Sequence, residues 1–270
     1  MGGSAQFRKK IQEKSKPQTA FEQVRARFGE DVTWHIEGVN QEGFAKGMIA
    51  MVDKFGDDVV PLNDISNGYL PIPAEGRTNL FGGQITVSGN NCNRYVNGNY
   101  SISGADGETT AAIVIAHELT HKIAGFTATF TIRKIAEMED LILNEYNYSR
   151  FQYGHDLGLE CEKPGGLTKD RLEHFLISER GMPFMDAHNL SVLTFSRYRN
   201  YEKFCSDVTA QASRTAGVAQ SDLFSAISKY ASDKGATEAI PEAVADVTIH
   251  GDKASWASKA VYNAFNELLN

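Results

Sequence analysis

Apolar and polar positions follow different periods in different parts of the chain. Apolar residues recur at helical spacing at about 19–28 and 41–55, which predicts two amphipathic helices, whereas strict alternation predicts a half-buried strand at 32–37. Residues 56–107 are rich in Gly, Pro and Asn and contain short strand-like pieces, the clearest at 84–88. Helical spacing then continues over most of the remaining chain. We therefore expect an α+β fold, with a small mixed sheet ahead of one buried helix and a mostly helical C-terminal half.

The buried helix is predicted at about 106–124. Its first half, residues 109–116, reads Thr-Thr-Ala-Ala-Ile-Val-Ile-Ala and carries no charge. Asp106 or Ser103 can cap its N-terminus, and Gly125 stands where a glycine commonly ends a helix. A helix this apolar is expected in the core of a globular domain.

This helix carries the motif His-Glu-Leu-Thr-His at 117–121, an HExxH sequence. At i, i+4 spacing His117 and His121 lie on one face, with Cβ atoms about 5–6 Å apart, so both imidazoles can bind one metal ion. Glu118 projects about 100° around the helix from His117, which places it beside the metal as a base. An accidental match is expected in about one chain in a hundred, mostly on exposed helices. Burying these side chains without partners costs several kcal/mol, which favours a zinc site here.

Composition and charge narrow the functional classes. The chain has 270 residues, enough for one large domain, and a formal net charge of −7, which gives no electrostatic reason to expect nucleic acid as a partner. Its three cysteines are far apart and form no Cys-x-x-Cys pair, so neither a disulfide framework nor a thiolate zinc site is indicated. Residues 1–18 are basic and polar and are expected to form a flexible tail, followed by a single domain at 19–270.

The two histidines need a third protein ligand, because a catalytic zinc ion is usually bound by three side chains and one water. One candidate is Glu145, on a predicted downstream helix. The others are Glu238, Glu242 and Asp246, which stand at i, i+4 and i+8 and form an acidic stripe on a predicted helix at 238–249. Such a stripe repels itself by roughly a few tenths of a kcal/mol per pair unless a cation lies opposite. The spacing leaves these alternatives open.

A second motif precedes this stripe, since residues 227–231 read Ile-Ser-Lys-Tyr-Ala and lead almost directly into Glu238. HExxH, this motif and then Glu-Ala-x-x-Glu-Ala-x-Ala-Asp resemble, in that order, the phage-encoded zinc metallopeptidase domains (gluzincins) associated with minor head proteins. The order is similar, more distantly, to the catalytic domain of anthrax lethal factor. The resemblance implies a zincin-like domain in which Glu238 is the third zinc ligand, Glu242 is an outer partner and Tyr230 faces the site. It also implies that the strand at 84–88 is the edge strand ahead of the active helix.

Pro241 departs from that group, in which alanine is the more usual residue. Proline is tolerated in the first turn of a helix but breaks a later one, so we expect the helix to begin near 238–240. This position also leaves Glu242, supported by Asp246 one turn later, open as the metal ligand.

These observations together predict a zinc-dependent metalloendopeptidase that acts on a protein or peptide substrate. Glu118 would act as general base on zinc-bound water as it attacks the peptide carbonyl, and Tyr230 would donate a hydrogen bond to the developing oxyanion. The alternative is a non-enzymatic phage virion or assembly protein that keeps a structural zinc site, with other virion proteins as partners. With no apolar signal-peptide segment and no run of membrane-spanning length, we expect a cytoplasmic or virion-associated protein without membrane contact.

Overall fold

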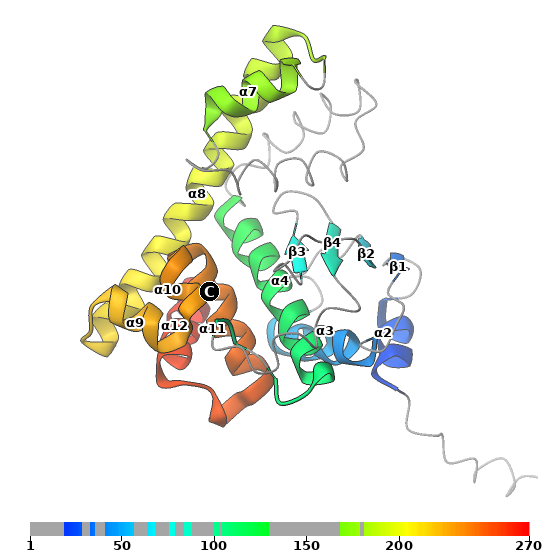
Figure 1. Ribbon diagram of the computed structural model, residues 1–270, viewed down its shortest axis with the longest axis vertical. Coiled ribbons are helices and arrows are strands. Elements are labelled where there is room, and N and C mark those ends of the chain that lie inside the picture. Colours follow the sequence, from blue (N-terminus) through cyan, green and yellow to red (C-terminus); the bar gives the residue numbers. More distant parts are fainter. Residues whose placement is uncertain are drawn as a thin grey trace, which may run out of the picture.

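Helices make up most of what the computed structural model describes (Figure 1). The description covers residues 19–28, 33–35, 41–56, 64–67, 76–78, 84–87, 100–102, 104–129, 168–178 and 181–269. The expected tail at 1–18 lies outside these residues. The first two helices, α2 (Ala20–Phe28) and α3 (Gln41–Phe55), form where helical spacing of apolar residues predicts them.

The α+β fold class that the sequence pattern predicts is wrong for the described part of the chain, which is predominantly helical. Among the described residues, strand structure is confined to four pieces of three or four residues: β1 (Thr33–His35), β2 (Asp64–Asn67), β3 (Gly76–Thr78) and β4 (Gln84–Val87). The pattern misleads because alternation over a few residues indicates only that one face is buried. A sequence rich in Gly, Pro and Asn also keeps each paired stretch short.

The four strands pair in the order β1-β2-β4-β3. β1 and β2 are parallel, as are β2 and β4, whereas β3 runs antiparallel to β4. The expected edge strand at 84–88 is therefore internal, which corrects that prediction. β3 lies at the edge of the sheet instead, where it contacts the helix that carries the HExxH motif.

That helix, α4, runs from Gly107 to Thr129. Asp106 caps it, since its Oδ1 atom accepts a hydrogen bond from the backbone N–H of Thr109 at 2.7 Å. The prediction that Gly125 ends the helix is wrong, because the helix continues past this buried glycine. A glycine costs a helix interior about 1 kcal/mol, and burial of the neighbouring Ile123 outweighs that cost.

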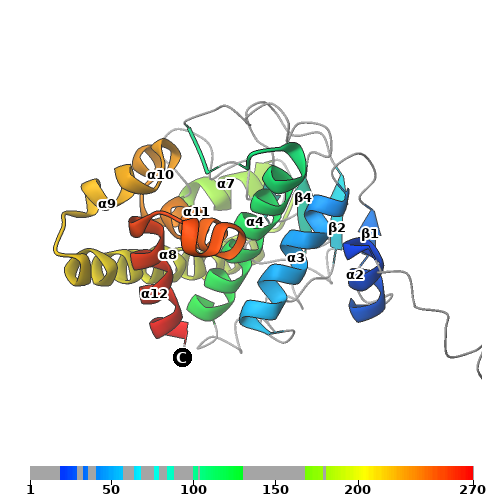
Figure 2. The ribbon, with the colours of Figure 1, turned by 90° about the horizontal axis from the view of Figure 1, so that it is seen from below.

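α3 packs directly along α4, and a glycine makes their close approach possible. A Cβ atom on Gly47 would lie 2.4 Å from the carbonyl oxygen of Ala112 and 2.3 Å from the Cγ2 atom of Ile115. On its other side α4 contacts α11 (Ala236–His250), so that it lies between the two helices (Figure 2). The motif is thereby held in the interior of the molecule.

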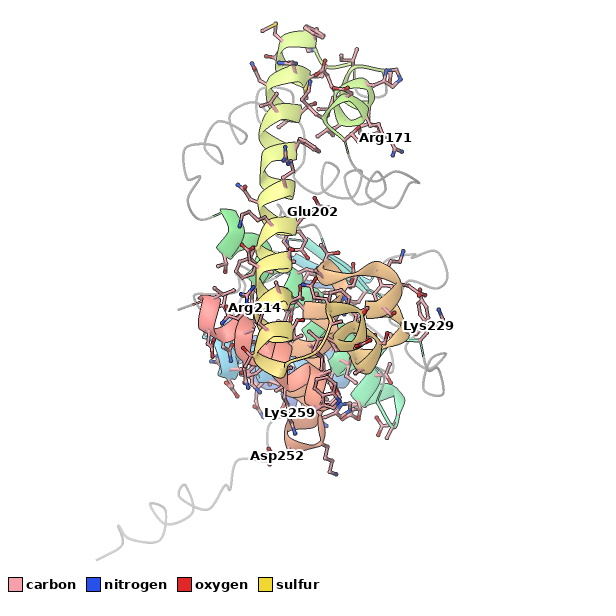
Figure 3. The ribbon with its side chains drawn as sticks, turned by 90° about the vertical axis from the view of Figure 1, so that its left-hand side faces the viewer. Arg171, Glu202, Arg214, Lys229, Asp252 and Lys259 are labelled. Carbon is pink, nitrogen blue, oxygen red and sulfur yellow. The ribbon has the colours of Figure 1, made fainter. Side chains whose placement is uncertain are left out.

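The described part of the C-terminal half, residues 168–178 and 181–269, is mostly helical, as its spacing predicts. The further helices are α7 (Lys169–Ser178), α8 (Phe184–Ala216), α9 (Gln220–Ile227), α10 (Lys229–Lys234), a short 3-10 helix (Gly251–Lys253) and α12 (Trp256–Leu269). α8 has 33 residues, and its first half extends away from the body together with α7 (Figure 3). Its second half packs against α4, α11 and α12. None of the described helices is both long and apolar enough to cross a membrane.

Candidate metal centre

Helices α4 and α11 bring three potential metal ligands together. His117 and His121 lie one turn apart on α4, and Glu238 lies in the first turn of α11. The Nε2 atoms of the two histidines are 3.2 Å apart, and the Oε2 atom of Glu238 lies 3.1 Å from His117 Nε2 and 3.3 Å from His121 Nε2. The three side chains could therefore hold one metal ion.

The protonation states of these three side chains depend on one another. Burial lowers the pKa of His117, but hydrogen bonds to Glu238 and Glu242 outweigh burial and hold that pKa well above its ordinary value. Burial also disfavours the charged form of Glu238, yet the charge of His121 and hydrogen bonds from both histidines hold the pKa of Glu238 well below its ordinary value. A metal cation at this place would supply the positive charge that protons supply without it.

Glu242 lies one turn after Glu238 and contacts the opposite side of the His117 ring. Its Oε1 atom is 3.3 Å from His117 Nδ1, and its Oε2 atom accepts a hydrogen bond from the backbone N–H of Ile102 at 2.8 Å. The residue is 3% exposed. Glu242 thus lies where an outer partner orients a ligating imidazole, on the nitrogen that faces away from the metal.

Tyr201 on α8 has the corresponding place beside His121, and sequence reasoning missed it. Its hydroxyl oxygen lies 2.8 Å from His121 Nδ1 and 3.3 Å from the carbonyl oxygen of Thr237, the residue before Glu238. Tyr201 follows His121 by 80 residues, and no motif or spacing marks it in the sequence. Each candidate histidine ligand therefore has a partner on its second nitrogen.

Glu118, the candidate base, is nearly buried beside this group. It is 6% exposed, and its charge contributes to the raised pKa of His117. The edge strand β3 lies directly against it, since a Cβ atom on Gly76 would come within 2.6 Å of Glu118 Oε1 and 2.7 Å of its Cγ. A glycine at this position is what allows the strand to approach the carboxylate so closely.

Lys122 follows Glu118 by one turn and was also missed by sequence reasoning. Its Nζ atom is buried and has no hydrogen-bond partner among the described residues. Burial lowers the pKa of Lys122 to about 7, although the negative charge of Glu118 acts in the opposite direction. An amino group whose charge changes near neutral pH therefore lies on the same helix face as the candidate base.

Tyr230 lies close to the centre, near the start of α10. Its backbone N–H donates a hydrogen bond to the carbonyl of Tyr100 at 2.6 Å, and its ring centroid is 5.5 Å from that of Tyr100. The ring centroid of His117 is 6.3 Å away. Burial, followed by the charges of three glutamates including Glu238 and Glu118, raises the pKa of Tyr230. The phenol therefore keeps its proton and remains a hydrogen-bond donor.

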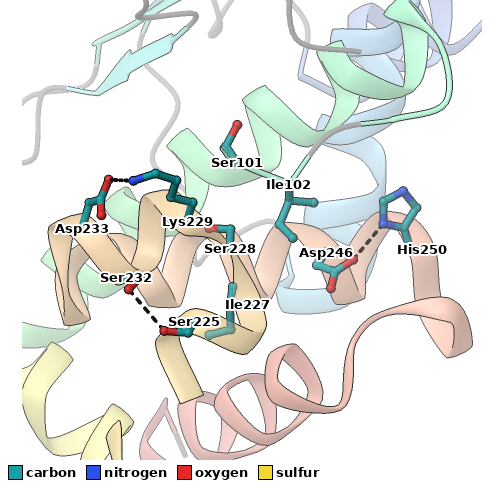
Figure 4. Close-up of a pocket in the computed structure, with 10 residues that line it drawn as sticks. All are labelled: Ser101, Ile102, Ser225, Ile227, Ser228, Lys229, Ser232, Asp233, Asp246 and His250. Atoms are coloured by element: carbon teal, nitrogen blue, oxygen red, sulfur yellow. Dashed lines mark hydrogen bonds and ion pairs between the residues drawn. The ribbon is translucent and has the colours of Figure 1, made fainter. Parts of the chain in front are cut away.

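Asp246 lies at the other end of α11, away from the three candidate ligands. Its Oδ1 atom is 2.8 Å from His250 Nδ1, and its Oδ2 atom accepts a hydrogen bond from the backbone N–H of Ser255 at 3.1 Å. Asp246 and His250 line a separate pocket of about 650 Å³ that none of the candidate ligands lines (Figure 4). This placement corrects the prediction of Asp246 as an alternative ligand or outer partner, because eight helical residues separate it from Glu238 by about 12 Å.

Two further expectations concern the third ligand. Glu145, the remaining candidate, lies outside the described residues. The third-ligand helix begins at Ala236 and not near 238–240, so Pro241 lies beyond its first turn. Glu238 is thus the carboxylate that the structure brings to the two histidines.

Comparisons of the chain with protein-family models, with curated proteins and with solved structures found no match. The resemblance to phage metallopeptidases therefore rests on the motifs at 117–121, 227–231 and 238–246 alone.

Proposed function

We propose that this protein is a zinc-dependent metalloendopeptidase in which His117, His121 and Glu238 hold the zinc ion. Their ligand atoms form a triangle with sides of 3.1–3.3 Å. Zinc binds nitrogen and oxygen ligands tetrahedrally at about 2.0–2.1 Å, which requires ligand atoms about 3.3–3.4 Å apart. Two imidazoles and one carboxylate are also a ligand set of catalytic zinc sites. The side lengths and the donor set both fit zinc.

The number of ligands supports catalysis over a purely structural role. Structural zinc sites use four protein ligands, whereas catalytic sites use three and leave one position open. Within the described ranges, no fourth His, Cys, Asp or Glu joins the group. The ligand side chains are 12% exposed for each histidine and 21% exposed for Glu238, so solvent can reach them.

The observation that carries the proposal is the position of Glu118 beside this triangle. Zinc in the triangle would polarise a peptide carbonyl and lower the pKa of water towards neutrality. Glu118 would take a proton from the attacking water and deliver it to the leaving amine. The strand β3 packs against the carboxylate, because Gly76 lies directly beside it. A base held this way loses little freedom when the reaction begins.

Tyr230 would act on the peptide carbonyl and not on the attacking water. Its hydroxyl is protonated at neutral pH, as for tyrosine in general, and burial raises its pKa further, so it can donate a hydrogen bond. The peptide carbonyl oxygen gains negative charge during attack, and a donor aimed at this oxygen stabilises the transition state. Tyr230→Phe removes only this hydroxyl.

The proposal is tested by the change Glu118→Gln, which removes the base but keeps the shape of the side chain. We expect one zinc ion per chain to remain bound, while turnover falls by about 10²–10⁴-fold. Cleavage would be measured on a proteome-derived peptide library by mass spectrometry, with zinc content measured on the same samples.

Glu108→Gln is the matched control. This substitution makes the same chemical change on the same helix. Glu108 lies in the exposed first turn, however, and pairs with Lys46. It should retain full zinc content and full turnover. A zinc-loaded wild type that cleaves nothing, or a Glu118→Gln variant with unchanged turnover, would show that the proposed function is wrong.

A further inference from the structure

The hydroxyl of Tyr201 connects both helices that supply the candidate ligands. Tyr201 is 2% exposed on α8, and its hydroxyl contacts His121 of α4 and the Thr237 carbonyl of α11, at 2.8 Å and 3.3 Å. Thr237 is the residue before Glu238. A single oxygen atom from a third helix therefore contacts one of the three ligands and the residue that precedes another.

The contact with Thr237 has a specific cause in the sequence. Pro241 lies inside α11, four residues after Thr237. A proline has no backbone N–H, so the carbonyl of Thr237 lacks the donor that an α-helix normally provides. A buried carbonyl without a donor is costly, and the hydroxyl of Tyr201 supplies the missing hydrogen. The proline that departs from the expected motif thus creates the acceptor for Tyr201.

This hydrogen bond also requires a proton on Nδ1 of His121. A phenol has one hydrogen to donate, and Tyr201 donates it to Thr237. Its oxygen must then accept a hydrogen bond from the Nδ1–H of His121. His121 Nε2 then faces His117 and Glu238, where a metal ion would replace its hydrogen bond to Glu238.

We propose that Tyr201 is a positioning residue of the metal centre: it keeps a proton on His121 Nδ1, so that Nε2 faces the other two ligand atoms, and it holds the Glu238 turn in place before a metal binds. The proposal rests on metal binding by the proposed centre, and it does not depend on the peptidase reaction. It assigns to α8, which supplies no ligand, the task of aligning the ligands of two other helices.

The experiment compares zinc affinity in wild type and Tyr201→Phe by competition with a chromophoric chelator. Loss of an outer partner of a ligating histidine typically weakens metal binding by about 10–100-fold, and we expect a change of that size. The matched control is Tyr262→Phe on α12, a residue whose ring packs against Phe55. This control should bind zinc as tightly as the wild type.

The change Pro241→Ala in the Tyr201→Phe background separates positioning from packing. Alanine returns an N–H to the Thr237 carbonyl, so the double variant should recover stability, measured by thermal unfolding. It should not recover zinc affinity, because His121 Nδ1 still lacks its acceptor. Recovery of affinity together with stability would overturn the proposal.

A second measurement uses metal-free wild-type protein and does not depend on any variant folding. Nitrogen-15 NMR of the histidine rings should show that Nδ1 of His121 carries a proton. A His121 Nδ1 without a proton in the wild type would overturn the proposal. Equal zinc affinity in wild type and Tyr201→Phe would overturn only the role of Tyr201. A wild type that binds no zinc would overturn both this role and the proposed function.

Discussion

The two ends of α11 each place a carboxylate against an imidazole, but they do so in different ways. At the N-terminal end, Glu238 Oε2 lies 3.1 Å from His117 Nε2. At the C-terminal end, Asp246 Oδ1 lies 2.8 Å from His250 Nδ1. The two residues of the N-terminal pair are 121 positions apart in the chain and join two helices, whereas the C-terminal pair joins two neighbouring turns of one helix.

This difference separates a candidate metal centre from a structural ion pair. Glu238 meets two histidines whose second nitrogens are already occupied, by Glu242 and Tyr201. Asp246 meets one histidine and uses its other oxygen to accept a hydrogen bond from Ser255, just ahead of α12. A carboxylate and a histidine are therefore not enough. The centre requires a second helix that supplies two further nitrogens to the same point.

The largest expected effect comes from removing the candidate ligand at the N-terminal end of α11. Glu238→Ala removes one of three ligands, so zinc affinity should fall by more than the about 10–100-fold typical of losing an outer partner. Asp246→Ala should leave zinc affinity unchanged. Both affinities would be measured by chelator competition, and equal losses in the two variants would contradict the assignment.

A smaller loss is expected for Glu242→Gln. The amide keeps the hydrogen bond from Ile102 possible but removes the charge beside His117 Nδ1, and zinc affinity should fall by about 10–100-fold. Glu202→Gln, a change in an exposed residue of α8, is the control (Figure 3). An unchanged affinity in Glu242→Gln would show that Glu242 does not support the ligand.

Zinc affinity should also depend on pH. The imidazole of His117 must be unprotonated to bind a metal, and the pKa of His117 is raised in the metal-free protein. Affinity should therefore reach its plateau only above this raised pKa and fall by up to about tenfold per pH unit below it. Titration calorimetry in two buffers of different ionisation enthalpy would measure the protons released. Binding without proton release at pH 7 would contradict the raised pKa.

The smallest effect concerns the C-terminal pair. Asp246→Asn weakens the hydrogen bonds to His250 and Ser255, which should cost about 1–2 kcal/mol of unfolding free energy because one partner is charged. Zinc affinity should be unaffected. Urea unfolding of the metal-free protein measures this change, and a loss of zinc affinity in Asp246→Asn would mean that the two ends of α11 are not independent.

Local sequence information was sufficient for the parts of the centre that lie within one helix. The spacing of His117 and His121 places both rings on one face of α4 whatever the rest of the fold does. Glu238 is different, because spacing does not distinguish it from Glu242 and Asp246 as the third metal ligand. Only the order of the later motifs favours it. The structure separates the three by their partners: Glu238 and Glu242 contact different nitrogens of His117, whereas Asp246 contacts His250 on its own helix.

The parts that sequence could not predict depend on packing between distant segments. Tyr201 reaches His121 only because α8 packs across α4 and α11. Gly76 contacts Glu118 only because β3 is the edge strand. The end of α4 was misplaced because a glycine signal is weak compared with the burial of the surrounding turn. The prediction of the fold class was wrong because short alternating stretches do not reveal how few of the described residues pair into strands.

The most direct test of the central claim is anomalous X-ray scattering at the zinc edge from crystals grown with zinc. The account predicts one strong peak at about 2.0–2.2 Å from His117 Nε2, His121 Nε2 and Glu238 Oε2. It predicts no peak between Asp246 and His250. A peak at the Asp246–His250 pair, or none among the three ligand atoms, would contradict it.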